Sequence, residues 1–158
     1  MPPPGQLSPE LHEFIESMGV YFEKYALPRI GGRMLGLLIV TDRELSLDDI
    51  ASTLLVSRAS VSTNIRLIIA IGLAELVTHP GDRRDYYRFA QNAWEQALLA
   101  DIEGTMAFRR MAERGLEAAH GSQDTATEHL ASMIEFCDTA LEDRYTTLKR
   151  WRESHPRK

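Results

Sequence analysis

The chain has 158 residues, of which 44% are hydrophobic and 26% charged, and its formal net charge is −5. This length suits one compact domain, and the hydrophobic share can supply a core. The longest apolar stretch, Leu35 to Val40, is too short to span a bilayer, and the first residues lack the charged and apolar regions of a secretion signal. These features, with Cys137 as the single cysteine, exclude a disulfide framework and predict a cytoplasmic protein without membrane partners.

Residues 8–45 predict two helices. Ser8 and the proline after it have the pattern of a helix cap and first turn, and apolar residues then recur at three- and four-residue steps as far as Tyr25. Pro28 opens a second helix that is expected to end near Val40. The first of these helices is long and amphipathic.

The second predicted helix contains glycines and arginines that need an explanation. Gly31, Gly32 and Gly36 would weaken an isolated helix, so they predict close contact with a neighbouring helix. Arg29 and Arg33 have the reach to bind a phosphate or a carboxylate. We expect structural ion pairs for both.

Residues 46–72 predict two short helices joined by a tight connection. Ser57 is well placed to cap the second helix by accepting a hydrogen bond from the amide of Ser60. Each helix has one apolar face on which the other can pack, which is the pattern of a helix-turn-helix. The apolar positions are Leu47, Ile50, Ala51 and Leu54 in the first helix and Val61, Ile65, Ile68 and Gly72 in the second.

The remaining surface of the second helix is small, polar and cationic, which suits the major groove of DNA. Arginine can bond to guanine, asparagine to adenine, serine and threonine to bases or phosphates, and alanine permits close approach. The alternative is an ordinary surface helix of an all-helical protein. The predicted DNA-contacting residues of this helix and its cap are Ser57, Arg58, Ala59, Ser60, Ser62, Thr63, Asn64 and Arg66.

A β-hairpin is expected after this helix, with strands at 73–79 and 85–89 and a charged turn between them. Arg83 and Arg84 lie at its tip, where they can enter a minor groove or contact phosphates. Asp82 and Asp85 reduce the local positive charge and can orient these arginines through ion pairs. The alternative is a solvated hairpin without a DNA contact.

These elements resemble the GbsR branch of the MarR-type transcriptional regulators. The resemblance covers residues 10–90, and it is carried by the helix pair, by the Asp82-Arg83-Arg84 wing and by Leu-Pro-Arg-Ile-Gly-Gly-Arg-Met-Leu-Gly-Leu-Leu at 27–38. It implies a homodimeric DNA-binding repressor or activator whose effector site differs among members. Mainly α structure with a small β-wing is the implied fold, in which long C-terminal dimerisation helices follow a winged helix-turn-helix headpiece.

The distribution of charge is compatible with DNA binding although the chain is acidic. From Ser57 to Arg88, five arginines and three acids give +2, so the remainder carries −7. Affinity for DNA depends on the field at the contacting surface and not on the total charge. The excess is modest, which favours two copies that act together.

Two long helices are predicted at 92–119 and 124–153, each roughly 40 Å long. We interpret the apolar stripe of the last helix as a dimer interface, while intrachain folding of the two helices on each other is the alternative. A two-fold dimer would place two recognition helices about 34 Å apart, as a near-palindromic operator requires. The stripe consists of Leu130, Ile134, Cys137, Leu141, Tyr145 and Leu148, with Met133 and Trp151 beside it.

A small-molecule effector pocket is expected between the headpiece and the dimerising helices, where ordinary core packing is the alternative for every residue. Aromatic faces could hold a cationic ligand there. Such a ligand would act by binding one spacing of the two headpieces better than another. The candidate effector residues are Tyr21, Tyr25, Met34, Trp94, Phe108 and Met111.

Enzymatic and metal-binding motifs are missing from the sequence. The histidines are scattered, and neither a metal-ligand spacing nor a phosphate-binding glycine loop occurs. We therefore predict no catalytic site, no metal and no cofactor. The prediction is one MarR/GbsR-like domain over residues 1–158, made of N-terminal helices at 8–45, a winged helix-turn-helix at 46–90 and a helical dimerisation region at 91–153. The rival function is that of a winged-helix protein-interaction module without DNA binding.

Overall fold

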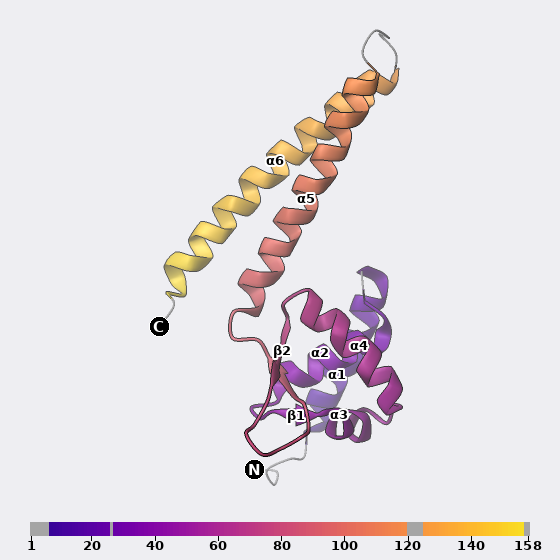
Figure 1. The fold of residues 1–158 in the computed structure, drawn as a ribbon, viewed down its shortest axis with the longest axis vertical. Helices are drawn as coiled ribbons and strands as arrows, with labels where there is room; N and C mark the ends of the chain where they lie inside the picture. The colour runs from indigo at the N-terminus through magenta and orange to yellow at the C-terminus, as the bar shows by residue number, and fades with distance from the viewer. Residues whose placement is uncertain (1–6, 26, 120–124, 157–158) are drawn as a thin grey trace. The chain divides into compact units, whose positions relative to one another are not determined.

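The computed structural model describes residues 7–25, 27–119 and 125–156. The chain forms two compact units, residues 1–93 and residues 94–158 (Figure 1). The first unit contains the helices and strands of the predicted headpiece, and the second consists of the long C-terminal helices. None of the helices in the described part of the chain has the length and apolar character needed to cross a membrane.

The first unit begins with two helices, α1 at Pro9–Tyr25 and α2 at Arg29–Val40. Their close contact depends on glycine, as the sequence predicted. A Cβ on Gly32 would lie 2.6 Å from the carbonyl oxygen of Met18, so no side chain fits between the two backbones there. The entropic cost of glycine in a helix is thus offset by tight packing.

Ion pairs reinforce the packing of α1 on α2. Arg33 donates from Nε to Glu16 at 2.6 Å, and Arg29 pairs with the same carboxylate at 3.4 Å. Arg33 also donates to the carbonyl oxygen of Leu54, 3.0 Å away, which links α2 to the end of the next helix. The predicted structural role of Arg29 and Arg33 is confirmed.

The helix-turn-helix consists of α3 at Leu47–Leu54 and α4 at Arg58–Ala70. A capping box starts α3, because Ser46 accepts from the amide of Asp49 while Asp49 accepts from Ser46. Hydrogen bonds from Ser46 also lower the pKa of the Asp49 carboxyl. At the end of α3, Leu55 adopts a left-handed conformation with φ 55°, which turns the chain toward α4.

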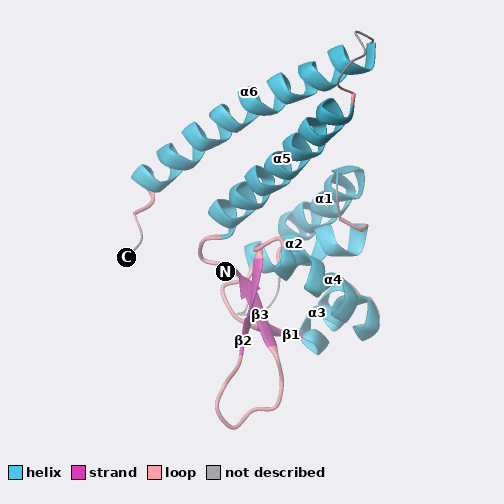
Figure 2. Ribbon diagram, turned by 45° about the horizontal axis from the view of Figure 1, so that its top comes forward, coloured by secondary structure: helices cyan, strands magenta, loops and turns pink. Residues whose placement is uncertain are grey.

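A three-stranded antiparallel sheet completes the unit, with the order β1-β3-β2 (Figure 2). The hairpin strands are β2 at Ala74–Val77 and β3 at Tyr86–Phe89, which lie inside the predicted ranges. The sequence did not predict β1 at Leu45–Ser46, which pairs with β3 opposite Tyr86 and Tyr87. Two residues are too few to show the alternating pattern of a strand.

The core of the first unit lies where α2, α3 and α4 meet the sheet. Tyr87 of β3 and Leu45 of β1 are both buried in this core. The apolar faces predicted for α3 and α4 supply much of it, which explains why the two helices pack together. The most deeply buried side chains here are Ile15, Met34, Leu35, Leu37, Leu38, Leu45, Ile50, Val61 and Ile68.

The second unit is a helical hairpin, formed by α5 at Ala93–Ala118 and α6 at Thr125–Ser154. The two helices run antiparallel, as Figures 1 and 2 both show. Cys137 and Leu148 of α6 are buried within the hairpin, together with Ile102 and Ala112 of α5. Part of the predicted α6 stripe, including Cys137, therefore packs inside one chain, which was the alternative to a dimer interface.

Three arginine ion pairs fix the register of this hairpin. Arg109 binds Asp138, Arg144 binds Asp101, and Arg152 binds Glu95 at 2.8 Å. The acceptor Glu95 is itself buried. Along α5 the paired residues run from Glu95 through Asp101 to Arg109, while their partners on α6 run backward from Arg152 through Arg144 to Asp138, so a shift in register would break all three pairs.

Candidate nucleic-acid interface

The N-terminus of α4 is capped as predicted. The Oγ of Ser57 accepts a hydrogen bond of 3.1 Å from the amide of Ser60, and it lies 2.9 Å from the hydroxyl of Ser60. Because the cap fixes the first turn, the side chains of Arg58 and Ala59 project from a defined position.

Most of the predicted contact residues of α4 are accessible. Ser60 and Ser62 are half-buried and Asn64 is buried, whereas the other five form an exposed face on the side opposite Val61 and Ile65. Such a face presents hydroxyl and guanidinium donors, which can bond to base edges and phosphates. The exposed residues are Ser57, Arg58, Ala59, Thr63 and Arg66.

Asn64 departs from the prediction. Only 7% of the residue is exposed, so its side chain cannot lie on the surface that would meet bases. The reason is helical geometry, since position 64 follows Val61 by three residues and precedes Ile68 by four, which places it on the buried face. Its Nδ2 donates to the carbonyl oxygen of Ser60 at 2.9 Å. The prediction that Asn64 contacts a base directly is therefore wrong.

The two arginines of α4 differ in their pairing. Arg58 forms an ion pair of 3.0 Å with Asp48 of α3, and both side chains are largely exposed. Exposed pairs contribute little to stability and exchange readily with other anions. Arg66 has no ion pair within the described residues, so its guanidinium is available to a ligand.

The wing turn is organised around Asp82. Its carboxylate accepts from the backbone amide and the guanidinium of Arg84 and from the hydroxyl of Tyr86, at 2.8 to 3.3 Å. The Arg84 side chain is the largest cause that lowers the pKa of the Asp82 carboxyl, followed by the Arg84 amide and then by Tyr86. The Arg84 guanidinium also lies 5.4 Å from the centre of the Tyr86 ring. The predicted orienting role of Asp82 is thus confirmed for Arg84, whereas neither Asp82 nor Asp85 forms an ion pair with Arg83 within the described residues.

Arg83 has a different environment from its neighbour. It is exposed, and across the described ranges it has no ion-pair partner. The wing therefore presents one arginine that is held in place and one that is free to move. Gly81, with φ +85° and open space around it, permits the turn that carries both.

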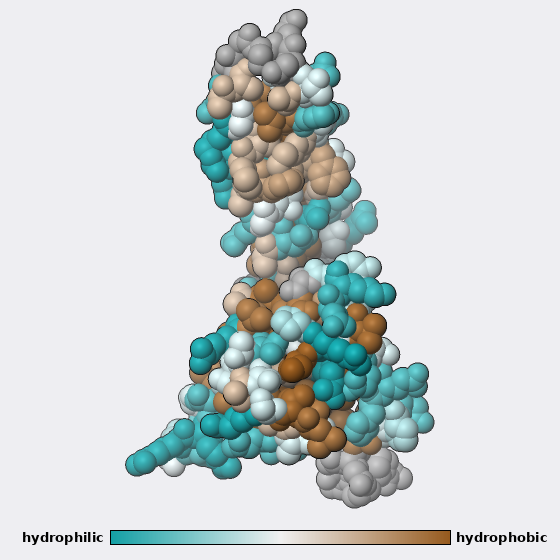
Figure 3. Space-filling model, turned by 90° about the vertical axis from the view of Figure 1, so that its right-hand side faces the viewer, coloured by the Kyte–Doolittle hydropathy of each residue, from teal (hydrophilic) through white to brown (hydrophobic). Residues whose placement is uncertain are grey.

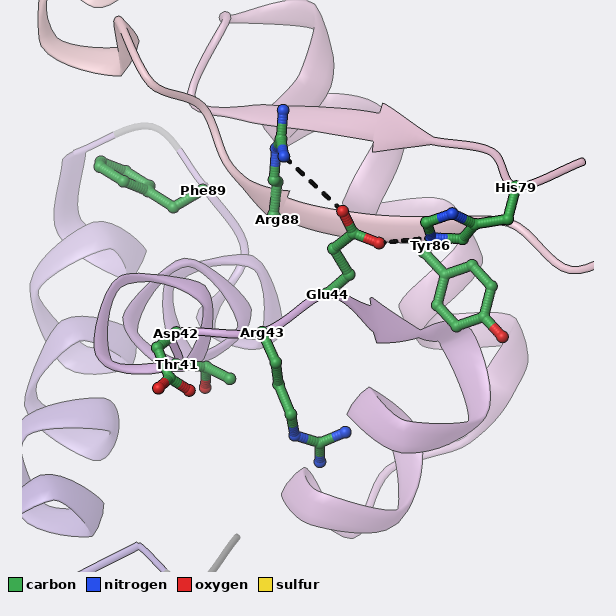
Figure 4. A pocket seen from close by; sticks show the side chains of 8 residues that line it. All are labelled: Thr41, Asp42, Arg43, Glu44, His79, Tyr86, Arg88 and Phe89. Atoms are coloured by element: carbon green, nitrogen blue, oxygen red, sulfur yellow. Dashed lines mark hydrogen bonds and ion pairs between the residues drawn. The ribbon is translucent and has the colours of Figure 1, made fainter. Parts of the chain in front are cut away.

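A second group of ion pairs lies at the base of the wing (Figure 4). Glu44 contacts His79 at 2.6 Å and Arg88 at 3.6 Å, and Arg88 also binds Glu75. Glu44, His79 and Arg88 border an open hollow of about 600 Å³. Sequence reasoning missed the group because Glu44 lies 35 residues from His79, and no local pattern connects them.

The candidate effector residues have unequal accessibility. Met34 is 0% exposed in the core of the first unit, so it is closed to a ligand in this structure. Tyr21 and Tyr25 lie exposed on α1 with their ring centres 4.8 Å apart, and they border an open apolar hollow of about 450 Å³. The other candidates, on α5, are Trp94, Phe108 and Met111, and all three are exposed.

Comparisons with known proteins agree with this architecture. Residues 27–85 match the model of the MarR family, and residues 92–154 match that of an MmpR5-like MarR family transcriptional regulator. The chain is 36% identical over 126 residues to the HTH-type transcriptional regulator MmpR5 of Mycobacterium tuberculosis (strain ATCC 25618 / H37Rv), an alignment that covers 79% of this chain and 76% of that protein. A crystal structure of a transcriptional regulator superposes with a TM-score of 0.84 at 32% identity, covering 92% of this chain and 99% of the other.

The capped α4, the hairpin wing and the long helices define a winged helix-turn-helix protein of the regulator class. More particularly, the chain belongs to the MarR family of transcriptional regulators. This family consists of regulators and not of enzymes. The family predicted from the sequence is confirmed, whereas the finer assignment to the GbsR branch is not, since the C-terminal match is to an MmpR5-like model.

Proposed function

We propose that the protein is a sequence-specific DNA-binding regulator that acts as a homodimer. In this proposal α4 enters the major groove, with Ser60, Ser62, Thr63 and Arg66 closest to the bases. Arg58, Arg83 and Arg84 contact phosphates or the adjacent minor groove. The main observation in support of this proposal is the exposed face of α4, where Thr63 and Arg66 are accessible beside a capped helix N-terminus.

The electrostatics of the first unit support this proposal. Arg66 and Arg83 lack ion pairs in the described structure, and Arg58 has only a solvent-exposed one. Little intramolecular pairing would therefore have to be broken when phosphates bind. The ion pair between Arg84 and Asp82 instead orients the Arg84 guanidinium before DNA binds. The side chain therefore loses less conformational entropy on binding.

Exposed apolar side chains on the second unit support dimerisation. One face of the helical hairpin carries a patch of apolar side chains, drawn in brown and tan (Figure 3). Large exposed patches of this kind mark interaction surfaces, and MarR regulators act as dimers. A second copy of the chain is therefore the proposed occupant. The large exposed apolar residues of the two helices are Trp94, Met106, Phe108, Met111, Phe136 and Tyr145.

Control by a small molecule completes the proposal. Tyr21 and Tyr25 offer accessible aromatic faces on α1, and Trp94, Phe108 and Met111 offer apolar surface on α5. An effector would change operator affinity by binding one arrangement of the two headpieces more tightly than another. Its effect on DNA binding is limited to that difference in affinity.

Salt dependence distinguishes this function from that of a protein-interaction module. The duplex that the protein selects from a random pool is titrated with wild-type protein at a series of salt concentrations. The proposal predicts affinity that falls steeply with salt and a marked preference for the selected duplex over scrambled DNA of equal length. Equal binding to both duplexes would remove sequence specificity, and failure to enrich any duplex from the pool would remove the DNA-binding function.

A further inference from the structure

Asn64 is a buried asparagine of α4 whose side chain faces α2. The Nδ2 of Asn64 donates to the carbonyl oxygen of Ser60, whereas its Oδ1 is buried and has no hydrogen-bond partner among the described residues. A buried amide oxygen without a partner costs stability, and such groups are few in native proteins. Stability alone therefore does not explain an asparagine here.

The unpaired oxygen lies against the first turn of α2. A Cβ on Gly31 would be 3.2 Å from Oδ1, closer than most side-chain contacts allow. No side chain caps α2, since its N-cap residue is Pro28. The first amides of a helix lack partners within the helix and carry a partial positive charge, which favours a carbonyl dipole. Gly31 thus lets the Asn64 oxygen approach an uncapped helix start.

We propose that Asn64 is a positioning residue that fixes the first turn of α4 relative to α2 and thereby determines which base edges α4 contacts. One end of its amide holds the carbonyl of Ser60, and the other lies against Gly31. The hydroxyl of Ser60 is in turn within hydrogen-bonding distance of Ser57. This inference rests on the proposed function, in which α4 contacts DNA.

The test uses the full-length chain and the duplex that the wild type selects from a random pool. Asn64→Leu fills a similar space and removes the orphaned oxygen, so its thermal midpoint should equal or exceed that of the wild type. Its affinity for the selected duplex should fall about tenfold, and the variant should select a different base at one or more positions. The slope of affinity against salt should stay unchanged, because the phosphate contacts remain.

Ile65→Val is the matched control, since Ile65 is buried on the same helix. It should lower the thermal midpoint and keep the wild-type base preference. Asn64→Leu with wild-type affinity and base preference would overturn the inference, whatever its stability.

If Asn64→Leu does not fold, Gly31→Ala replaces it, because the added Cβ displaces Oδ1. Wild-type base preference in the Gly31→Ala variant would also overturn the inference. Failure of the wild type to select any duplex would instead refute the proposed function.

Discussion

Arg84 binds the carboxylate of Asp82 through both its backbone amide and its guanidinium, so two residues of the wing turn are locked together. Tyr86 donates to the same carboxylate from the following strand. The arginine next to it, Arg83, has no such restraint in the described structure. The Asp82 carboxylate therefore fixes the direction of the Arg84 side chain, whereas the Arg83 side chain has no ion pair in the described structure.

The Asp82 carboxyl should titrate well below its usual pKa of 3.8, because the ionised form accepts the hydrogen bonds of Arg84 and Tyr86. A folded-state pKa that is lowered means that ionised Asp82 stabilises the wing above its unfolded pKa. This stabilisation is lost as the pH falls through the folded-state pKa. The ¹³C chemical shift of the carboxyl, followed by NMR against pH, measures the midpoint. Tyr86→Phe should raise the midpoint, and an ordinary midpoint in the wild type would contradict the geometry.

Removal of either wing arginine should make DNA binding less dependent on salt. Arg83→Ala and Arg84→Ala should each reduce the magnitude of the slope of log affinity against log salt by about 1 per protomer. Fluorescence anisotropy with a labelled duplex measures the slope. Arg150→Ala, an exposed arginine on α6, is the control and should leave it unchanged. A wild-type slope in both wing variants would exclude the wing from the phosphate contacts.

The cap of α4 should contribute measurably to folding. Ser57→Ala leaves the amide of Ser60 without its acceptor, so the free energy of unfolding should fall by about 1 kcal/mol. Urea denaturation followed by circular dichroism measures this change. Ser57→Asp retains an acceptor and should restore most of the loss. An alanine variant as stable as the wild type would show that water replaces the cap without cost.

The apolar surface of the helical hairpin should govern assembly. Phe136→Asp replaces a phenyl group that is 69% exposed in the single chain with a charge, so it should weaken dimerisation at least tenfold, by roughly 1.5 kcal/mol or more. Sedimentation equilibrium measures the dissociation constant. Thr146→Asp adds the same charge at an exposed polar position of α6 and serves as the control. Equal effects of the two substitutions would place Phe136 outside the interface.

Local sequence signals predicted local structure well. The Ser57 cap depends on residues three apart, and the glycines of the second helix predicted a close contact with a neighbouring helix, so both features followed from short-range rules. Asn64 was misplaced because its chemical type suggested adenine. Its spacing from Val61 and Ile68 already indicated the buried face.

Features that depend on tertiary structure had no such signal. The pairing of Glu44 with His79 joins residues 35 apart, and β1 becomes a strand only through its partner β3. Burial of Met34 likewise follows from how α2 enters the core, and an apolar side chain alone does not separate core from ligand site.

Selection of bound duplexes from a random pool tests the central claim most directly. If two recognition helices contact one face of the DNA, the enriched sequences should contain a two-fold symmetric site whose half-sites lie about 10 base pairs apart. Arg66→Ala should then lose about 1 to 3 kcal/mol of discrimination at one position in each half-site. A pool that remains random after repeated selection, with the protein folded and dimeric, would contradict the account.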